Sequence, residues 1–301
     1  DWIGFGMATA SWPTEGGEAT VKATLRADGT AQIACATQDI GTGTYTVIAQ
    51  VAAEVLDLRI ESVEVAIGHS FLPPGPISGG SMVTATIVPV VARAARDLRN
   101  SLLSKACEPG GIFEGQDPAT LRFKHGHIEG PRRVALKDIF DAAGIHSLEA
   151  EARSVEPGKF SFRSFGAHCV EVRWNPKAAK LRVSRVVSVF DVGRAINHAT
   201  AANQIHGSLV MGLGMALLEE SVYDRRTGRV VTDNLADYLV PVHADTPRMD
   251  IHFLDRPDPH IGEFGAKGIG EVGITGFPAA IANAVFHATG KRIRKIPIKV
   301  E

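Results

Sequence analysis

The pattern that most constrains the fold is a β-hairpin that leads into an apolar helix, and the chain contains this pattern twice. Residues 18–36 alternate polar and apolar positions around a turn at 27–30, which predicts a hairpin. From Thr44 to Leu58 the apolar residues recur at the spacing that puts them on one helical face. Two strands around a turn at 175–177, followed by an apolar helix over 201–219, repeat this order. Hairpins mixed with helices predict an α+β fold and not a regularly alternating doubly wound sheet.

The length predicts two subdomains. At 301 residues the chain exceeds the size at which one hydrophobic core stops growing, about 250–300 residues. Residues 107–131 are rich in glycine, proline and charge, which predicts a surface excursion or the seam between subdomains. We place the boundary near Ser154, so that residues 1–154 and 155–301 form two similar subdomains of mixed hairpin sheets packed with helices. Further strands are expected over 63–67 and 249–254, and further helices over 82–103 and 277–289.

Charge and cysteine content argue against several classes of function. The 32 Lys and Arg balance 33 Asp and Glu without a run of like charges, so no nucleic-acid or membrane-surface partner is expected. The most apolar stretch, 205–218, is shorter than the ~20 residues that a bilayer span needs. Three distant cysteines without a C-x-x-C pair predict neither a disulfide framework nor a cysteine-held metal site. His125 and His127 lack a third ligand, so no metal held by protein side chains is predicted.

The glycine-rich segment 262–276 is the first candidate site. It contains a formal G-x-G-x-x-G at Gly268, Gly270 and Gly273, but a Pro/Asp loop precedes it instead of a strand, so a dinucleotide-binding Rossmann unit is rejected. The glycines let backbone N–H groups approach an anion ahead of the next helix, and Lys267 would add a positive charge. Glu271 is either a solvated loop carboxylate or a general base held in a glycine-walled pocket, and composition does not choose between these interpretations.

Three further positions leave both a structural and a functional interpretation open. Residues 38–44 join a strand to a helix and are either a tight turn or a loop that presents N–H and hydroxyl groups to a phosphate or a heterocycle. Ser78–Ser81 with Thr84 forms either an ordinary helix start or a second anion-binding one. Gln204 faces water near a helix end or points its amide into a pocket. No G-x-S-x-G elbow supports covalent hydrolysis.

Five segments together carry a resemblance that none of them carries alone. They occupy residues 4–10 (GFGMATA), 37–50 (TQDIGTGTYTVIAQ), 78–87 (SGGSMVTATI), 191–220 and 265–290, the last of which contains K-G-x-G-E. In this order they resemble the C-terminal half of the molybdenum-binding subunit of the xanthine dehydrogenase and aldehyde oxidase family. The chain is most similar to the bacterial aldehyde-oxidising branch with three subunits.

The resemblance implies a site for a molybdopterin cytosine dinucleotide, whose molybdenum is held by the pterin dithiolene. Glu271 matches the catalytic glutamate of the family, the base that takes a proton from the oxygen nucleophile. Relatives often have glutamine where this chain has Thr42, which weakens the case for a pterin hydrogen bond there. The implied cofactor-binding residues are Gly41, Thr42, Gly43 and Thr44 at the pterin or its phosphates, Ser78, Gly79, Gly80, Ser81 and Thr84 on the nucleotide side, and Gln204, Lys267, Gly268 and Gly270.

The resemblance also implies an activity and partners. The expected reaction oxidises a small aldehyde to a carboxylic acid, or hydroxylates an N-heterocycle, with water as the oxygen source. The N-terminal half of the molybdenum subunit and separate iron–sulfur and FAD subunits, carrying [2Fe–2S] and FAD, would complete the enzyme, and the isolated chain is expected to be inactive. No export leader precedes the first strand, so a cytoplasmic location is expected, or a periplasmic one through a partner's signal. The alternatives are a non-catalytic cofactor-binding or assembly module, and a domain whose glycine loops are only turns.

Overall fold

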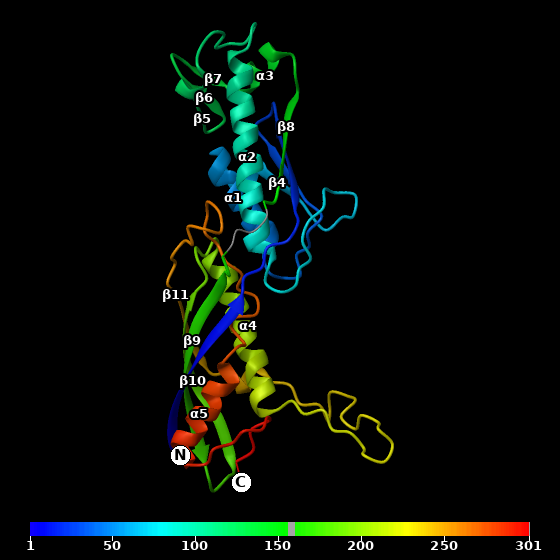
Figure 1. Cartoon of the computed structure of the whole chain (residues 1–301), viewed down its shortest axis with the longest axis vertical. Helices are drawn as coiled ribbons and strands as arrows, with labels where there is room; N and C mark the ends of the chain where they lie inside the picture. Colours follow the sequence, from blue (N-terminus) through cyan, green and yellow to red (C-terminus); the bar gives the residue numbers. More distant parts are fainter. Residues whose placement is uncertain (156–159, 301) are drawn as a thin grey trace. The chain divides into compact units, whose positions relative to one another are not determined.

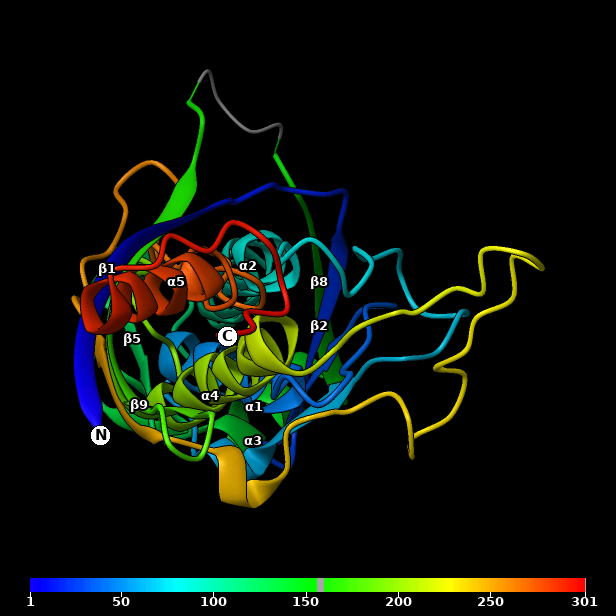
Figure 2. The same cartoon turned by 90° about the horizontal axis from the view of Figure 1, so that it is seen from below.

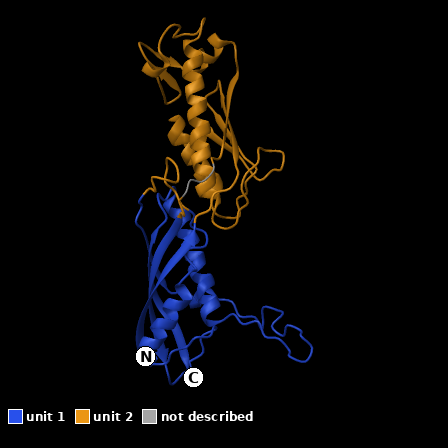
Figure 3. Cartoon of the chain, in the orientation of Figure 1, with its two compact units in different colours: residues 1–13, 163–256, 268–301 blue, residues 14–162, 257–267 orange. Residues whose placement is uncertain are grey.

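The computed structural model describes residues 1–155 and 160–300, which divide into two compact units (Figure 3). Unit 1 consists of Asp1–Pro13, Arg163–Arg256 and Gly268–Glu301. Unit 2 consists of Thr14–Phe162 and Pro257–Lys267. The units are therefore discontinuous in sequence, whereas the division that the sequence predicts near Ser154 is continuous.

Unit 2 is built on a four-stranded sheet in the order β4-β3-β2-β8 (Figure 1). The central strand β2 is antiparallel to both neighbours, and β3 is parallel to β4 because helix α1 makes the crossover between them. Helix α2 packs on β2, β8 and α1. The elements are β2 (Thr20–Arg26), β3 (Ala31–Ala34), α1 (Thr44–Leu56), the 3₁₀ turn η1 (Ile60–Ser62), β4 (Val63–Ala66), α2 (Val83–Cys107) and β8 (Ser147–Arg153).

Unit 1 repeats this design with the sheet order β1-β9-β10-β11. Strands β9 and β10 form the hairpin, α4 is the crossover, and β11 lies parallel to β10. One face of the sheet packs against α4 and α5 around Phe190, Ile205 and Phe277, all fully buried. The elements are β1 (Trp2–Pro13), β9 (Arg163–Asn175), β10 (Lys180–Asp191), α4 (His198–Leu217), the 3₁₀ turn η3 (His243–Asp245), β11 (Arg248–Phe253) and α5 (Phe277–Thr289).

The fourth strand explains why the units are discontinuous. In unit 2 the edge strand β8 follows α2 in sequence and pairs with β2. In unit 1 the corresponding edge strand is β1, which comes from the opposite end of the chain and pairs with β9 from Trp2↔Trp174 to Pro13↔Arg163. The sheet of unit 1 is thus completed by residues that are far away in sequence.

Helix α5 lies directly against β1, as both Figure 1 and Figure 2 show. The contact needs glycine, because a Cβ at Gly6 would lie 2.2 Å from the Ala280 carbonyl oxygen, and one at Gly4 would be equally obstructed. The open edge of β1 is capped by side chains of the same helix: the Phe5 N–H donates to His287 Nδ1 at 2.9 Å, and Asn283 Nδ2 donates to the Met7 carbonyl at 2.9 Å. The helix therefore protects an exposed strand edge from pairing with another chain.

The α+β class of mixed hairpin sheets packed with helices is confirmed. Both hairpins, the helices of residues 44–58, 82–103, 201–219 and 277–289, and the two further strands of residues 63–67 and 249–254 are present. Residues 107–131 are not a seam, because they lie within unit 2 and contribute two strands of a small sheet, whose Phe123 and Ile128 are buried. Its elements are η2 (Pro118–Thr120), β5 (Arg122–Lys124), β6 (His127–Glu129) and β7 (Arg133–Ala135), followed by α3 (Leu136–Ala143).

In the described part of the chain, no helix combines the length and apolar character that a membrane crossing requires.

Candidate functional site

The turn before α1 is organised by a carboxylate. Asp39 Oδ1 accepts hydrogen bonds from the N–H groups of Gly41, Thr42 and Gly43 at 2.8, 2.9 and 3.2 Å, and Oδ2 accepts one from the Tyr45 N–H at 3.3 Å. Gly41 and Gly43 have φ of 99° and 85°, which glycine tolerates best. Burial of the carboxylate raises its pKa, but the four backbone donors outweigh that effect and hold the pKa of Asp39 below its ordinary value.

A second loop is tied to this turn through Gln38. Ser78 N donates to Gln38 Oε1 at 2.9 Å, and Ser78 Oγ donates to the Gln38 carbonyl at 2.6 Å. Hydrogen bonds therefore connect the two loops of unit 2 that contain the predicted site residues 41–44 and 78–84. A Cβ placed at Gly41 or Gly80 would meet no described atom within 4 Å, so both glycines border open space.

Lys267 is also part of unit 2 and is buried, with 7% of its surface exposed. Its Nζ lies 4.0 Å from Asp258 Oδ2, an ion pair within the segment 257–267. Two backbone hydrogen bonds fold this segment, from Gly265 N to the Gly262 carbonyl and from Asp258 N to the Gly265 carbonyl, both 3.0 Å. The buried ammonium is therefore held by its own loop.

Glu271 lies in unit 1, half-buried in the run of turns that leads into α5. Ser208 on α4 connects this turn to Gln204, because Ser208 Oγ lies 2.8 Å from the Gln204 carbonyl and 3.4 Å from the Gly270 carbonyl. A Cβ at Gly273 would lie 2.7 Å from the Ser208 Cβ, so the close approach of α4 depends on glycine. On the other side, Ser164 Oγ of β9 donates to the Gly268 carbonyl at 2.6 Å. Gln204, Gly268, Gly270 and Glu271 thus form the second connected set.

His168 anchors the end of the Glu271 turn to the sheet. It is fully buried on β9, its Nε2 lies 3.0 Å from the Thr275 carbonyl, and its Nδ1 lies 2.8 Å from Ser188 Oγ on β10. Because a carbonyl only accepts, Nε2 carries the proton and Nδ1 accepts from the serine hydroxyl. Burial lowers the pKa of His168, although the bond to the Thr275 carbonyl acts in the opposite direction. The imidazole is therefore held neutral.

We expect His168 to make the stability of unit 1 fall in mild acid. The unfolded chain takes up this proton at the ordinary histidine pKa, whereas the folded chain takes it up at a lower pH. The stability that the neutral His168 contributes is fully present above the ordinary histidine pKa. It is lost as the pH falls from that pKa through the lower pKa of His168 in the folded chain. His168→Phe should cost about 1–3 kcal/mol at pH 7, because Ser188 and the Thr275 carbonyl lose their partner.

Denaturant unfolding at pH 7, 6 and 5 tests this expectation. The difference in unfolding free energy between the wild type and His168→Phe should shrink as the pH falls. Replacing His146, which is exposed, with glutamine is the control and should leave the wild-type pH dependence unchanged. A constant difference between the wild type and His168→Phe over this range would contradict the assignment.

The structure adds residues that sequence reasoning missed. Asp39 carried a signal, since an acid just ahead of a G-x-G helix start is a typical cap. Ser208 and His168 carried none, because a serine in an apolar helix and a histidine in an alternating strand resemble core positions. Each organises the backbone of a candidate loop.

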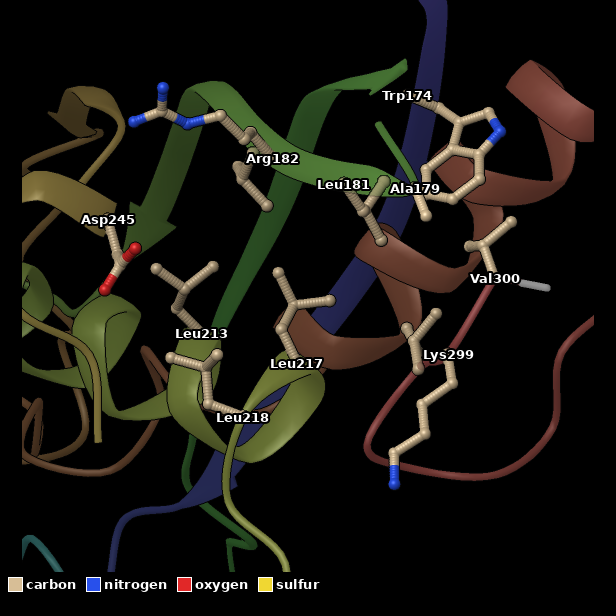
Figure 4. A pocket seen from close by; sticks show the side chains of 12 residues that line it. Trp174, Ala179, Leu181, Arg182, Leu213, Leu217, Leu218, Asp245, Lys299 and Val300 are labelled. Atoms are coloured by element: carbon tan, nitrogen blue, oxygen red, sulfur yellow. The ribbon is translucent and has the colours of Figure 1, made fainter. Parts of the chain in front are cut away.

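The cavity in Figure 4 lies elsewhere in unit 1. Its volume is about 310 Å³, and most of its lining residues are of apolar type, with Arg182, Asp245 and Lys299 among the others. None of the predicted site residues is among its lining residues. Within residues 1–155 and 160–300, histidine, cysteine and carboxylate side chains form no group of three or more that could hold a metal ion.

Comparison with known proteins gives consistent matches. The profile of the molybdopterin cofactor-binding domain family matches residues 1–247. The aldehyde oxidoreductase molybdenum-binding subunit PaoC of Escherichia coli K12 is 39% identical, over 92% of this chain and 37% of its own length. The putative xanthine dehydrogenase molybdenum-binding subunit XdhA of the same organism is 29% identical, over 98% of this chain and 40% of its own length. The chain thus spans less than half of these relatives.

Solved structures agree with this match. Quinoline 2-oxidoreductase from Pseudomonas putida 86 superposes with a TM-score of 0.85 at 25% identity, covering 98% of this chain and 40% of that one. The aldehyde oxidoreductase from Desulfovibrio gigas superposes with a TM-score of 0.76 at 24% identity, over 98% of this chain and 31% of that one, a likeness of fold.

Proposed function

We propose that this chain, which belongs to the molybdopterin cofactor-binding domain family, is the C-terminal cofactor-binding part of the molybdenum subunit of a molybdenum hydroxylase. The enzyme would oxidise small aldehydes to carboxylic acids or hydroxylate N-heterocycles, with water as the oxygen source. Support for the aldehyde type comes from the 39% identity to a subunit whose name specifies aldehyde oxidoreductase. The remainder of that subunit, and iron–sulfur and FAD subunits, are the proposed partners.

The observation that carries the proposal is the set of hydrogen bonds that hold the turn of Glu271 in place. The turn is half-buried and is tied on either side to α4 through Ser208 and to the sheet through Ser164 and His168. A general base must keep a fixed position relative to the group from which it takes a proton. A half-buried carboxylate on a turn that hydrogen bonds hold in place has that property. A non-catalytic module would not require a half-buried acid on a turn that is held by hydrogen bonds.

The donor groups fit a cofactor that carries pterin and phosphate. Such a cofactor carries hydrogen-bond acceptors. They match the serine and threonine hydroxyls, the glycine backbone that borders open space, and the buried lysine. We propose that Gly41, Thr42, Gly43 and Thr44 contact the pterin side, that Ser78, Gly79, Gly80, Ser81 and Thr84 contact the nucleotide, and that Gln204, Lys267, Gly268 and Gly270 complete the binding site. When bound, the molybdenum cofactor supplies the redox chemistry and activates the oxygen nucleophile.

The residues of the chain have distinct tasks in this proposal. Glu271 removes the proton from the nucleophile as the new carbon–oxygen bond forms. The hydroxyl and lysine groups hold the cofactor, and the glycines allow its backbone approach. [2Fe–2S] and FAD on the proposed partner chains would supply the electron-transfer chemistry.

The test is elemental analysis for molybdenum, together with cytidine nucleotide released by acid, on the chain purified with its native partners. We expect about one molybdenum and one cytidine nucleotide per chain. Molybdenum without cytidine would assign a form of the cofactor other than the cytosine dinucleotide. Absence of both from an intact complex would favour the alternative, a non-catalytic assembly module.

A further inference from the structure

The two units share one sheet design but differ on the sheet face that is turned away from the helices, which we call the outer face. In unit 2 every second residue of β2 is fully buried, and the residues between them on the outer face are Thr20, Lys22, Thr24 and Arg26. Lys22 pairs with Glu149 of β8 at 2.9 Å, and Arg26 pairs with Glu64 of β4 at 3.3 Å. A polar face with ion pairs is typical of a sheet that has water on one side.

The outer face of unit 1 carries large apolar side chains instead. Ile3, Phe5 and Met7 of β1 and Phe165 of β9 each expose between 47% and 59% of their surface. The register continues this surface over three strands, because Met7 pairs with Cys169 of β9, which pairs with Val187 of β10. We call these residues the outer patch: Ile3, Phe5, Met7, Phe165, Cys169 and Val187. Single apolar residues on a surface are ordinary, but a contiguous group of them marks an interaction site.

We propose that the outer patch of unit 1 is an interface that the remainder of the molybdenum subunit covers. The inference rests on the proposed function for the identity of the partner, and it adds the surface that this partner contacts. Unit 2 supplies the internal comparison, because the same sheet design has an ion-paired outer face there.

The partner packs on the face of the sheet and does not add a strand to it. The free edge of β1 is next to the patch, but Asn283 and His287 of α5 already bond the Met7 carbonyl and the Phe5 N–H there. A segment that extended the sheet at this edge would have to displace both side chains. Apolar side chains of the partner therefore pack over Phe5 and Met7.

The charged residues beside the patch do not require a charged partner. Glu171 pairs with Arg173 at 3.3 Å, and Asp250 pairs with Arg185 at 2.7 Å and with Arg248 at 3.4 Å. These carboxylates are therefore paired within the sheet. The patch itself contains phenylalanine and methionine, which are enriched in protein interfaces. Apolar interfaces are typical of permanent association, whereas transient interfaces are more polar.

The length of the relatives indicates which permanent partner is present. The match to PaoC covers 37% of that molybdenum-binding subunit, so more than half of a subunit of this kind lies outside the matched region. In the proposed function that portion belongs to the same subunit and is always available to unit 1. This continuous presence is what a permanent apolar interface requires. A second copy of the chain and the iron–sulfur and FAD subunits are the alternatives that the experiment separates.

Cys169 makes the interface measurable without a substitution. It is exposed within the outer patch, whereas Cys35 is buried. The rate of alkylation by N-ethylmaleimide is followed by mass spectrometry of the Cys169 peptide, in the chain alone, in the molybdenum subunit alone and in the native complex. We expect the rate to be at least about tenfold lower in the subunit and in the complex than in the chain alone, because thiol reactivity follows exposure.

Glu151→Cys is the matched control. Glu151 is exposed on the outer face of unit 2, in the edge strand β8. A cysteine at this position should react at a similar rate in all three samples. An equal loss of reactivity at both cysteines would indicate general shielding by the complex, and the inference would be wrong.

Three further results would overturn the inference. Cys169 that reacts as fast in the native complex as in the chain alone would show that the patch is uncovered. Protection that appears only with the iron–sulfur and FAD subunits would assign the patch to them. Protection that is already present in the chain alone and is lost on dilution would assign the patch to a second copy.

The alkylation rates separate this inference from the proposed function, which is decided by the molybdenum and cytidine content of the native complex. A complex that contains molybdenum but leaves Cys169 reactive refutes only the interface. A complex that protects Cys169 but contains neither molybdenum nor cytidine refutes only the cofactor assignment.

Discussion

Glu271→Gln should lower turnover by about 10²–10⁴-fold while leaving the cofactor bound, because glutamine keeps the size of the side chain but cannot take up a proton. The Ser208 and His168 contacts of the turn involve backbone carbonyls, so the substitution leaves the mounting of the turn intact. The measurement is steady-state turnover of the native complex with a panel of aldehydes and N-heterocycles, normalised to its molybdenum content.

Glu263→Gln is the matched control for this experiment. Glu263 is an exposed acid of the same glycine-rich segment and pairs with Arg96. It should retain turnover close to that of the wild type. Near-normal turnover of Glu271→Gln at full molybdenum content would show that another group is the base.

Gly6→Ala should destabilise unit 1 by about 2–3 kcal/mol. The added Cβ would lie 2.2 Å from both the Ala280 carbonyl oxygen and the Ala284 nitrogen, so backbone and not a flexible side chain must move. The shift would also separate Asn283 and His287 from the edge of β1. Denaturant unfolding monitored by far-UV circular dichroism measures the loss.

Gly207→Ala is the control for the glycine prediction. Gly207 lies within α4, is exposed, and a Cβ there would meet no described atom within 4 Å. Alanine is the better helix former, so the change should be neutral or stabilise by up to about 1 kcal/mol. A Gly6→Ala protein as stable as Gly207→Ala would contradict the close packing of α5 on β1.

The repeated hairpin and helix pattern could be predicted because each element carries its own periodicity. Helix α5 begins at Phe277 and ends at Thr289, as the apolar spacing and the proline in its first turn indicate. The pairing of β1 with β9 could not be predicted, because register between distant strands leaves no local signal. The strands of the small sheet are three residues long, too short for alternation to be recognised.

The candidate site was predictable only in part. Glu271 and the glycine loops were identified from their resemblance to a family, and composition alone left each with an ordinary structural interpretation. What the sequence could not provide is the pair of hydrogen-bond partners that hold the Glu271 turn: a serine on α4 and a histidine in β9. These partners come from other elements or from exact turn geometry, so only the folded chain shows them.

The origin of β1 has a consequence for how the chain is made. During translation β1 is synthesised before unit 2, but the strand with which it pairs is synthesised only after almost all of unit 2. Until then an apolar strand with two unpaired edges must be kept from associating with other nascent chains, and unit 2 can assemble while it waits. A protein divided between Phe162 and Arg163 would therefore not yield two complete domains, because the first fragment would carry the edge strand that the second one lacks.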